Sequence, residues 1–104
     1  MPGAIAVGFA DYEGECIQLE GGLEADVHRL HLAYQGIVLH QLQAIHLALG
    51  ETATRISSRY EDKHVIVQPL KSGYFVVLTL SPGANLFRAG QYLALTAREL
   101  NQDL

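Results

Sequence analysis

Apolar and polar residues alternate in short runs at the start of the chain and then change to a helical period. Small and apolar residues alternate over residues 4–10, which predicts a strand with one face close to other atoms. A turn at residues 11–14 leads to a second strand that contains Cys16, Ile17 and Leu19. Residues 24–49 contain no proline and Gly50 follows them, so we expect one long helix there.

Strand patterns return after this helix. Residues 52–60 alternate, residues 64–70 contain an apolar centre, and residues 74–80 are apolar at nearly every position. The last of these three predicted strands should be buried on both faces of a sheet. Residues 85–101 carry apolar side chains on one side and predict a final helix. The expected order is β-β-α-β-β-β-α, in a single domain over residues 1–104.

The long helix has too many apolar positions for one stripe. At 100° per residue, a broad apolar arc forms, and we expect it to cover the sheet. That arc consists of Val27, Leu30, Tyr34, Ile37, Val38, Leu42, Ile45, Ala48 and Leu49. A narrower second stripe interrupts the polar side, with a spacing typical of the seam between paired helices. That stripe consists of Leu32, Gly36, Leu39, Gln43 and Leu47.

The second stripe has two interpretations. Glycine costs roughly 1 kcal/mol in a helix interior relative to alanine, and at Gly36 it would let a second helix approach closely. Alternatively, the three leucines are ordinary scatter, since much of any protein surface is apolar. We favour the seam, which predicts a protein that works by binding a partner.

Composition narrows the class of protein. The chain of 104 residues is 49% hydrophobic with a formal net charge of −4, which argues against disorder and against general nucleic-acid binding. No apolar run reaches the ~20 residues of a membrane span, and the first residues do not resemble a secretory signal. The single Cys16 forms no internal disulfide, so we expect a cytoplasmic protein.

No residue set indicates catalysis. His28 and His31 are three positions apart on the predicted helix, but a structural zinc site normally has four ligands at characteristic spacings. The acids Asp11, Glu13 and Glu15 lie in a turn, where carboxylates are usually solvated. The glycines form no phosphate-binding loop. We therefore predict a protein that is not an enzyme, with no catalytic residue, metal ion or cofactor.

Two arginines offer a possible contact for a partner. Arg55 and Arg59 lie on the same face of the predicted third strand as Ser57 and would suit an acidic partner. The alternative is an ordinary exposed polar face.

Residues 60–70, with their central Val-Ile-Val, and residues 71–78, which open on Lys-Ser-Gly, carry a resemblance. They are similar to the third-to-fourth-strand hairpin, and to the turn and fifth strand, of the roadblock / dynein light chain family. Residues 84–86 at the start of the last helix and residues 98–100 near its end are also similar. The resemblance covers about residues 4–101.

The resemblance implies an α+β fold, an α/β sandwich of roadblock type. A five-stranded antiparallel sheet would carry the long helix on one face and the C-terminal helix on the other. Family members form homodimers or heterodimers by pairing the long helices antiparallel and joining their third strands. On this chain that interface would map to Leu32, Gly36, Leu39 and Gln43 on the helix and to Thr54, Ile56 and Ser58 on the strand.

The resemblance also implies a function. Many relatives are non-catalytic scaffolds or regulators of small Ras-like GTPases, others are adaptors of dynein motors, and bacterial relatives regulate the GTPase that sets polarity in gliding motility. We therefore predict a dimeric scaffold or regulator that binds a small Ras-like GTPase or its regulatory complex, in cell polarity or motility. The alternative is a small-molecule sensor module with a ligand cavity between sheet and helix.

The sequence departs from the family pattern at its start. Family members usually begin with a helix, whereas only residues 1–3 precede the first predicted strand here. The sheet face opposite the long helix would then be covered by the last helix alone. We expect Phe9 to be partly exposed on that face, and an exposed apolar patch would itself be a partner site.

Overall fold

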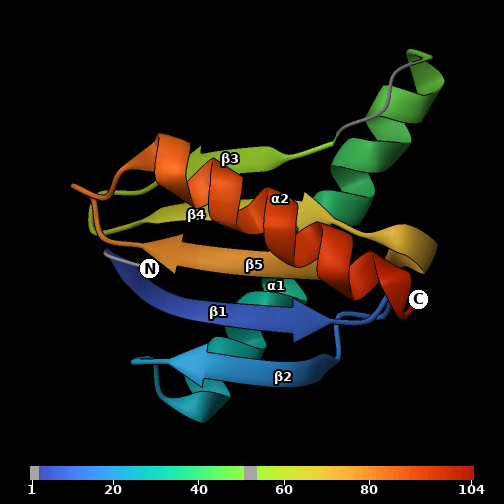
Figure 1. Ribbon diagram of the computed structural model, residues 1–104. Coiled ribbons are helices and arrows are strands. Elements are labelled where there is room, and N and C mark those ends of the chain that lie inside the picture. The colour runs from blue at the N-terminus through green and yellow to red at the C-terminus, as the bar shows by residue number, and fades with distance from the viewer. Residues whose placement is uncertain (1–2, 51–53) are drawn as a thin grey trace.

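The computed structural model describes residues 3–50 and 54–104 and forms an α+β sandwich, as predicted (Figure 1). Its elements are β1 (Ala4–Ala10), β2 (Cys16–Gly21), α1 (Ala25–Ala48), β3 (Ile56–Arg59), β4 (His64–Pro69), the 3₁₀ turn η1 (Lys71–Gly73), β5 (Phe75–Leu80) and α2 (Leu86–Gln102). The five strands form one antiparallel sheet in the order β2-β1-β5-β4-β3. α1 and α2 lie on opposite faces of this sheet.

Both helices begin where the sequence places a capping side chain. The Glu24 carboxylate accepts hydrogen bonds from the backbone N–H groups of Asp26 and Val27, at 3.1 and 3.3 Å. The Asn85 side chain accepts one from the backbone N–H of Arg88, at 3.1 Å. These bonds satisfy donors that the first turn of a helix leaves free, so the predicted helix starts are confirmed. Residues 52 and 53 of the predicted third strand lie outside the described residues.

β5 is the central strand of the sheet, between β1 and β4, and all six of its residues are buried. Its side chains alternate between two apolar clusters, one on each face. The cluster beneath α1 consists of Ala10, Leu32, Leu39, Val65, Val67, Phe75 and Val77. The cluster beneath α2 consists of Ile66, Val76, Leu78, Leu80, Ala89 and Leu93. The prediction of a strand buried on both faces is therefore confirmed.

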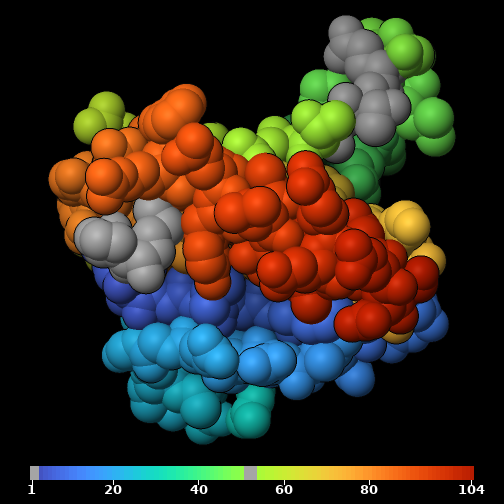
Figure 2. Space-filling view, in the orientation of Figure 1, coloured from blue at the N-terminus to red at the C-terminus, as the bar shows by residue number. Residues whose placement is uncertain are grey.

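α2 covers only part of its side of the sheet. It packs on β4 and β5 and leaves β1 and β2 along one side of the molecule, as the space-filling view shows (Figure 2). Phe9 of β1 is half-buried there, and its ring centroid lies 5.8 Å from that of Tyr74. The predicted partial exposure of Phe9 is confirmed.

The end of β2 gives a first testable prediction. Gly21 has a φ of 122°, and a Cβ at this position would lie 2.5 Å from the Cα of Ala6 in the neighbouring strand. Gly21→Ala should therefore lower the free energy of unfolding by about 1–3 kcal/mol in urea unfolding. Gly22→Ala is the matched control, because a Cβ there would meet only Ile5 O at 3.7 Å. Equal effects of the two substitutions would contradict the prediction.

Candidate interaction surface

α1 contacts the sheet through a narrow face. Its buried residues are His28, Leu32, Gln35, Gly36 and Leu39. The helix lies close to the sheet because Gly8 and Gly36 have no side chains at the contact. A Cβ on Gly8 of β1 would lie 2.6 Å from Leu32 Cδ2, and a Cβ on Gly36 would lie 3.0 Å from Phe75 Cζ. The close approach that Gly36 permits is therefore to the chain's own sheet.

This packing corrects the predicted assignment of helix faces. Leu32, Gly36 and Leu39 were expected in a seam with a second helix, but they are buried against the chain's own sheet. The other two members of that stripe lie toward the end of the helix, where Gln43 is half-buried and Leu47 is 78% exposed. The broad arc that was expected to cover the sheet is largely exposed instead. Helical periodicity reveals two apolar faces but does not identify which one meets the sheet.

The exposed face of α1 carries several large apolar side chains. We call it the outer arc and define it as Val27, Leu30, Tyr34, Ile37, Ile45 and Leu49, each between 54% and 73% exposed. Val38 and Leu42, also in the predicted broad arc, are half-buried beside it. Large exposed apolar patches mark interaction sites.

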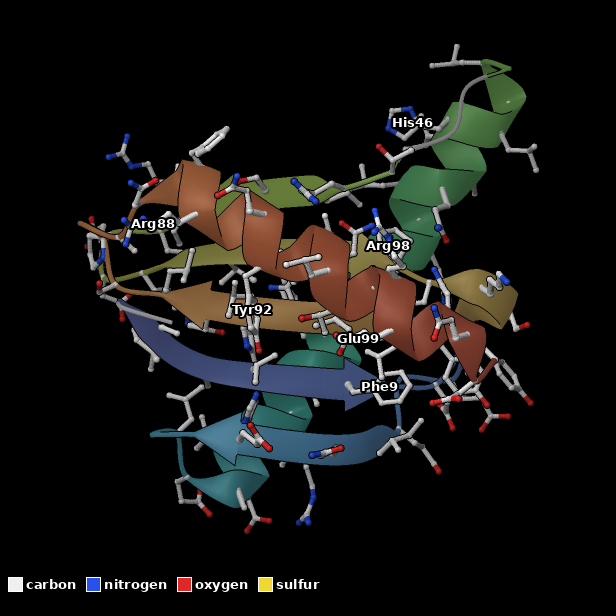
Figure 3. The ribbon with its side chains drawn as sticks, viewed as in Figure 1. Phe9, His46, Arg88, Tyr92, Arg98 and Glu99 are labelled. Carbon is white, nitrogen blue, oxygen red and sulfur yellow. The ribbon has the colours of Figure 1, made fainter. Side chains whose placement is uncertain are left out.

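The C-terminal part of α1 projects beyond the sheet, past β3 (Figures 1 and 2). Ile45, Leu47 and Leu49 are all exposed on this part. His46 lies on it as well (Figure 3). These residues extend the outer arc past the edge of the sheet, where this chain supplies no sheet for them to cover.

β3 forms one edge of the sheet, next to the projecting end of α1. An edge strand presents unpaired backbone donors and acceptors to a further strand. Of the residues expected in a strand–strand interface, Thr54 is exposed and precedes β3, while Ser58 is half-buried. Ile56 is also half-buried and packs against the cluster beneath α1. The predicted alternation of faces in this strand is present, because Ser57 lies on the other side and bonds to His64.

The two arginines predicted for a partner surface have different environments. Arg55 Nε donates to Gln68 Oε1 at 2.9 Å, and Arg55 Nη2 donates to the backbone oxygen of Gly90 at 3.2 Å. Arg55 therefore links the segment before β3 to α2, and this contact occupies its guanidinium group. Both arginines are exposed, and Arg59 lies at the end of β3.

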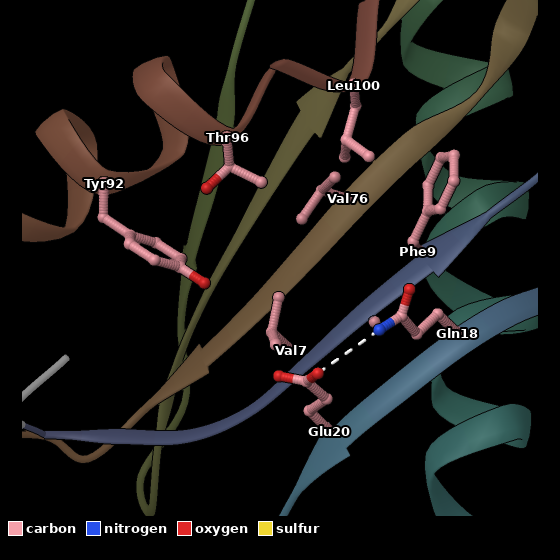
Figure 4. A pocket seen from close by; sticks show the side chains of 9 residues that line it. Val7, Phe9, Gln18, Glu20, Val76, Tyr92, Thr96 and Leu100 are labelled. Carbon is pink, nitrogen blue, oxygen red and sulfur yellow. Dashed lines mark hydrogen bonds between the residues drawn. The ribbon is translucent and has the colours of Figure 1, made fainter. Parts of the chain in front are cut away.

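A shallow groove of about 130 Å³ lies between α2 and the uncovered strands β1 and β2 (Figure 4). Tyr92 extends from α2 toward β1, as Figure 3 also shows, and Phe9 and Val7 form the apolar floor. On β2, Gln18 Nε2 donates to Glu20 Oε1 at 3.2 Å. The groove lies on the sheet face that the sequence predicted to be covered by the last helix alone.

Buried histidines on α1 give a pH prediction. Burial lowers the pKa of His28 below its ordinary value of 6.5, and burial, then Lys63, then His28 lower the pKa of His31 in the same direction. Below about pH 6.5 the unfolded chain thus binds more protons than the folded chain, so stability should fall as the pH drops, by at most ~1.4 kcal/mol per pH unit for each histidine.

Urea unfolding from about pH 8 to about pH 5 would measure this loss. His28→Gln should reduce the slope, whereas His40→Gln, at an exposed position on α1, should leave it unchanged. A slope that both variants share with the wild type would contradict the assignment to His28.

Within residues 3–50 and 54–104, no group of three or more His, Cys, Asp or Glu side chains is placed to hold a metal ion. None of the helices in these ranges is both long and apolar enough to cross a membrane.

Solved structures with the same architecture are known. The chain superposes on the Roadblock/LC7 domain from Streptomyces avermitilis with a TM-score of 0.89, over 97% of this chain and 85% of that chain, at 13% identity. For Myxococcus xanthus MglB the TM-score is 0.88, over 95% and 81% of the two chains, at 13% identity. For the gliding protein MglB from Thermus thermophilus it is 0.73, over 93% and 80%, at 20% identity.

No family model and no curated protein matches the sequence. The likeness of this chain to known proteins is therefore structural, and at these identities it concerns the fold. The five strands, the two helices and their order all agree with the architecture that the sequence resemblance implied. The chain has the fold of the roadblock/LC7 domain.

Proposed function

We propose that this chain is a non-catalytic, dimeric scaffold or regulator that binds a small Ras-like GTPase or its regulatory complex. The observation that carries the proposal is the outer arc of α1, whose six apolar residues are each more than half exposed. A soluble domain of this size gains stability by burying such a surface against a partner. A second copy supplies the same surface, and so would a related roadblock protein.

The dimer proposed here pairs two outer arcs around a two-fold axis. An axis beside β3 would join the edge strands of the two copies and make one sheet from two. The projecting end of α1 would then lie beneath the sheet of the second copy, where Ile45 and Leu49 would be covered. This arrangement replaces the predicted helix seam at Leu32, Gly36 and Leu39, and it keeps Thr54 and Ser58 at the strand edge.

The GTPase part of the proposal rests on the shared fold and on charge. The chain shares its fold with Myxococcus xanthus MglB and with a gliding protein from Thermus thermophilus. In a dimer joined at β3, the exposed Arg59 of each copy lies near the junction and presents a cation to an acidic partner. A regulator without catalytic residues can act by positioning the GTPase's own groups. From the fold shared with the gliding proteins we infer a cytoplasmic role in cell polarity or motility.

A pull-down from the native cytoplasm, followed by mass spectrometry, would test the partner. We expect a small Ras-like GTPase to be retained by the wild type and lost with Arg59→Glu. Arg29→Glu is the control, because Arg29 is an exposed arginine in the first turns of α1, where it pairs with Asp26 at 3.6 Å.

The chain would then be titrated into the purified GTPase, once with GTP and once with GDP bound to the GTPase. The rate of GTP hydrolysis would be measured in parallel. Saturable binding that Arg59→Glu abolishes would support the proposal. Absence of binding to either nucleotide form, with a dimer still present, would contradict the GTPase part of the proposal and leave the dimer intact.

A further inference from the structure

A second hollow lies on the α1 side of the sheet, apart from the groove beside α2. It has a volume of about 510 Å³ and opens between the first half of α1, the start of β1, the end of β5 and the turn between β3 and β4. This volume falls within the range of roughly 300–1,000 Å³ that small-molecule sites occupy. Ile5, Leu23, Val27 and Leu30 make most of its lining apolar.

His31, Asp62, Lys63 and Thr79 add polar groups to the same hollow, and two of these residues carry buried atoms without partners. Thr79 is 1% exposed, and its Oγ1 has no hydrogen-bond partner among the described residues. His31 Nδ1 is likewise buried without a partner among them. Buried polar groups are nearly always hydrogen-bonded, so two orphaned groups at one cavity indicate an absent acceptor or donor.

The chemistry of these groups shows which kind of ligand atom they can bind. Gln35 Nε2 is an amide nitrogen that can only donate, and it lies 3.2 Å from His31 Nε2. With the Gln35 amide placed so that Nε2 also donates to the Tyr60 hydroxyl at 3.4 Å, His31 Nε2 is assigned as the acceptor and the proton of the neutral ring to Nδ1. His31 Nδ1 and the Thr79 hydroxyl are then both donors, and the Lys63 ammonium adds a third donor and a positive charge.

We propose that this hollow binds a monocarboxylate with an apolar tail, with the carboxylate toward Lys63, His31 and Thr79. Three donors with one net positive charge match the acceptor oxygens and the single charge of a carboxylate. The apolar lining matches a tail. Asp62 also lines the hollow, but it is exposed, so water screens its charge.

A second copy of the chain is the competing occupant, because Val27, Leu30 and Tyr34 belong both to the hollow and to the outer arc. Covering the hollow with apolar side chains would leave the buried donors without acceptors, which is unfavourable. The carboxylate supplies those acceptors, so the observations favour it inside the hollow, while Ile37, Ile45 and Leu49 of the outer arc lie outside the hollow and stay available to a second copy. This inference does not require the proposed dimer or the proposed GTPase.

Octanoate is the probe, titrated into the full chain and followed by calorimetry and by NMR amide shifts. We expect saturable binding with one site per chain and with shifts centred on Thr79 and His31. Octanol has a comparable tail without the charge, and acetate has the charge without the tail, so both should bind more weakly.

Lys63→Gln should weaken octanoate binding by about tenfold, since it removes a charged hydrogen bond. Lys71→Gln is the matched control, because Lys63 and Lys71 are the two lysines of the chain and Lys71 lies in the exposed turn η1. Thr79→Val keeps the shape of the side chain, removes the hydroxyl and should also weaken binding. Circular dichroism would check that each variant is folded.

Three outcomes would overturn the proposal. One is the absence of saturable octanoate binding. Another is binding that Lys63→Gln leaves unchanged or that octanol matches. The third is binding to a monomeric Ile37→Asp variant but not to a wild-type dimer, which would show that a second copy fills the hollow. Sedimentation of the wild type reports the dimer separately, so failure of either proposal is recognised independently.

Discussion

Leu32→Ala should lower the free energy of unfolding by about 3–5 kcal/mol, whereas Leu30→Ala, two residues earlier on the same helix, should lower it by roughly 0.5 kcal/mol or less. Leu32 is fully buried, and Leu30 is 73% exposed. Leucine and alanine have similar helix propensities, so the difference reports packing. The Leu32 side chain fills the space beside Gly8, which has no side chain of its own. Leu32→Ala would leave a cavity there, and a cavity that the surrounding strands do not close adds to the loss of stability.

Urea unfolding would measure both variants, on protein diluted until sedimentation shows a monomer. Dilution matters because assembly adds stability to the folded state by mass action, and Leu30 belongs to the outer arc. If Leu30→Ala proves the more damaging substitution in the monomer, the inner and outer faces of α1 are reversed relative to the structure, and the first interpretation of the sequence would stand.

The secondary structure could be predicted from the sequence because local signals are strong in this chain. Glu24 and Asn85 cap the two helices, and Gly50, just beyond the end of α1, has a φ of 74°, a conformation that glycine adopts readily. The apolar run that became β5 has no polar alternation, and only a central strand buries both faces. Each of these features depends on a few neighbouring residues.

The faces of α1 were predicted wrongly because the buried face carries polar residues. His28 and Gln35 are each 2% exposed, yet their side chains made this side of the helix look like a solvent face. Gln35 is accommodated there because its amide lies within hydrogen-bond distance of His31 and of the Tyr60 hydroxyl. One sequence feature indicated the correct face: the small residues of β1. Gly8, which has no side chain, leaves room for the long side chain of Leu32.

The candidate sites depend on contacts between distant residues, which periodicity cannot reveal. Arg55 is exposed, as expected, but it also bonds to the backbone oxygen of Gly90, 35 residues later, and nothing in the sequence indicated this contact. The hollow brings together Ile5, His31, Lys63 and Thr79 from four separate elements or turns. No local pattern relates these positions, so the ligand class follows only from the folded arrangement.

Ile37→Asp should convert a dimer at micromolar concentration into a monomer, and Leu95→Asp should not. Ile37 lies in the outer arc of α1 and is 59% exposed, while Leu95 lies on α2 and is 58% exposed, so the two substitutions disturb the isolated chain similarly. In the proposed dimer only the aspartate at residue 37 would be buried without a counter-charge. We expect Ile37 to be a hot spot, and loss of a hot spot costs about 2 kcal/mol, which is roughly a 30-fold increase in Kd. Sedimentation velocity over a concentration series would measure both variants and the wild type. A monomeric wild type at micromolar concentration, or equal dissociation with Leu95→Asp, would show that the outer arc does not pair two copies of this chain.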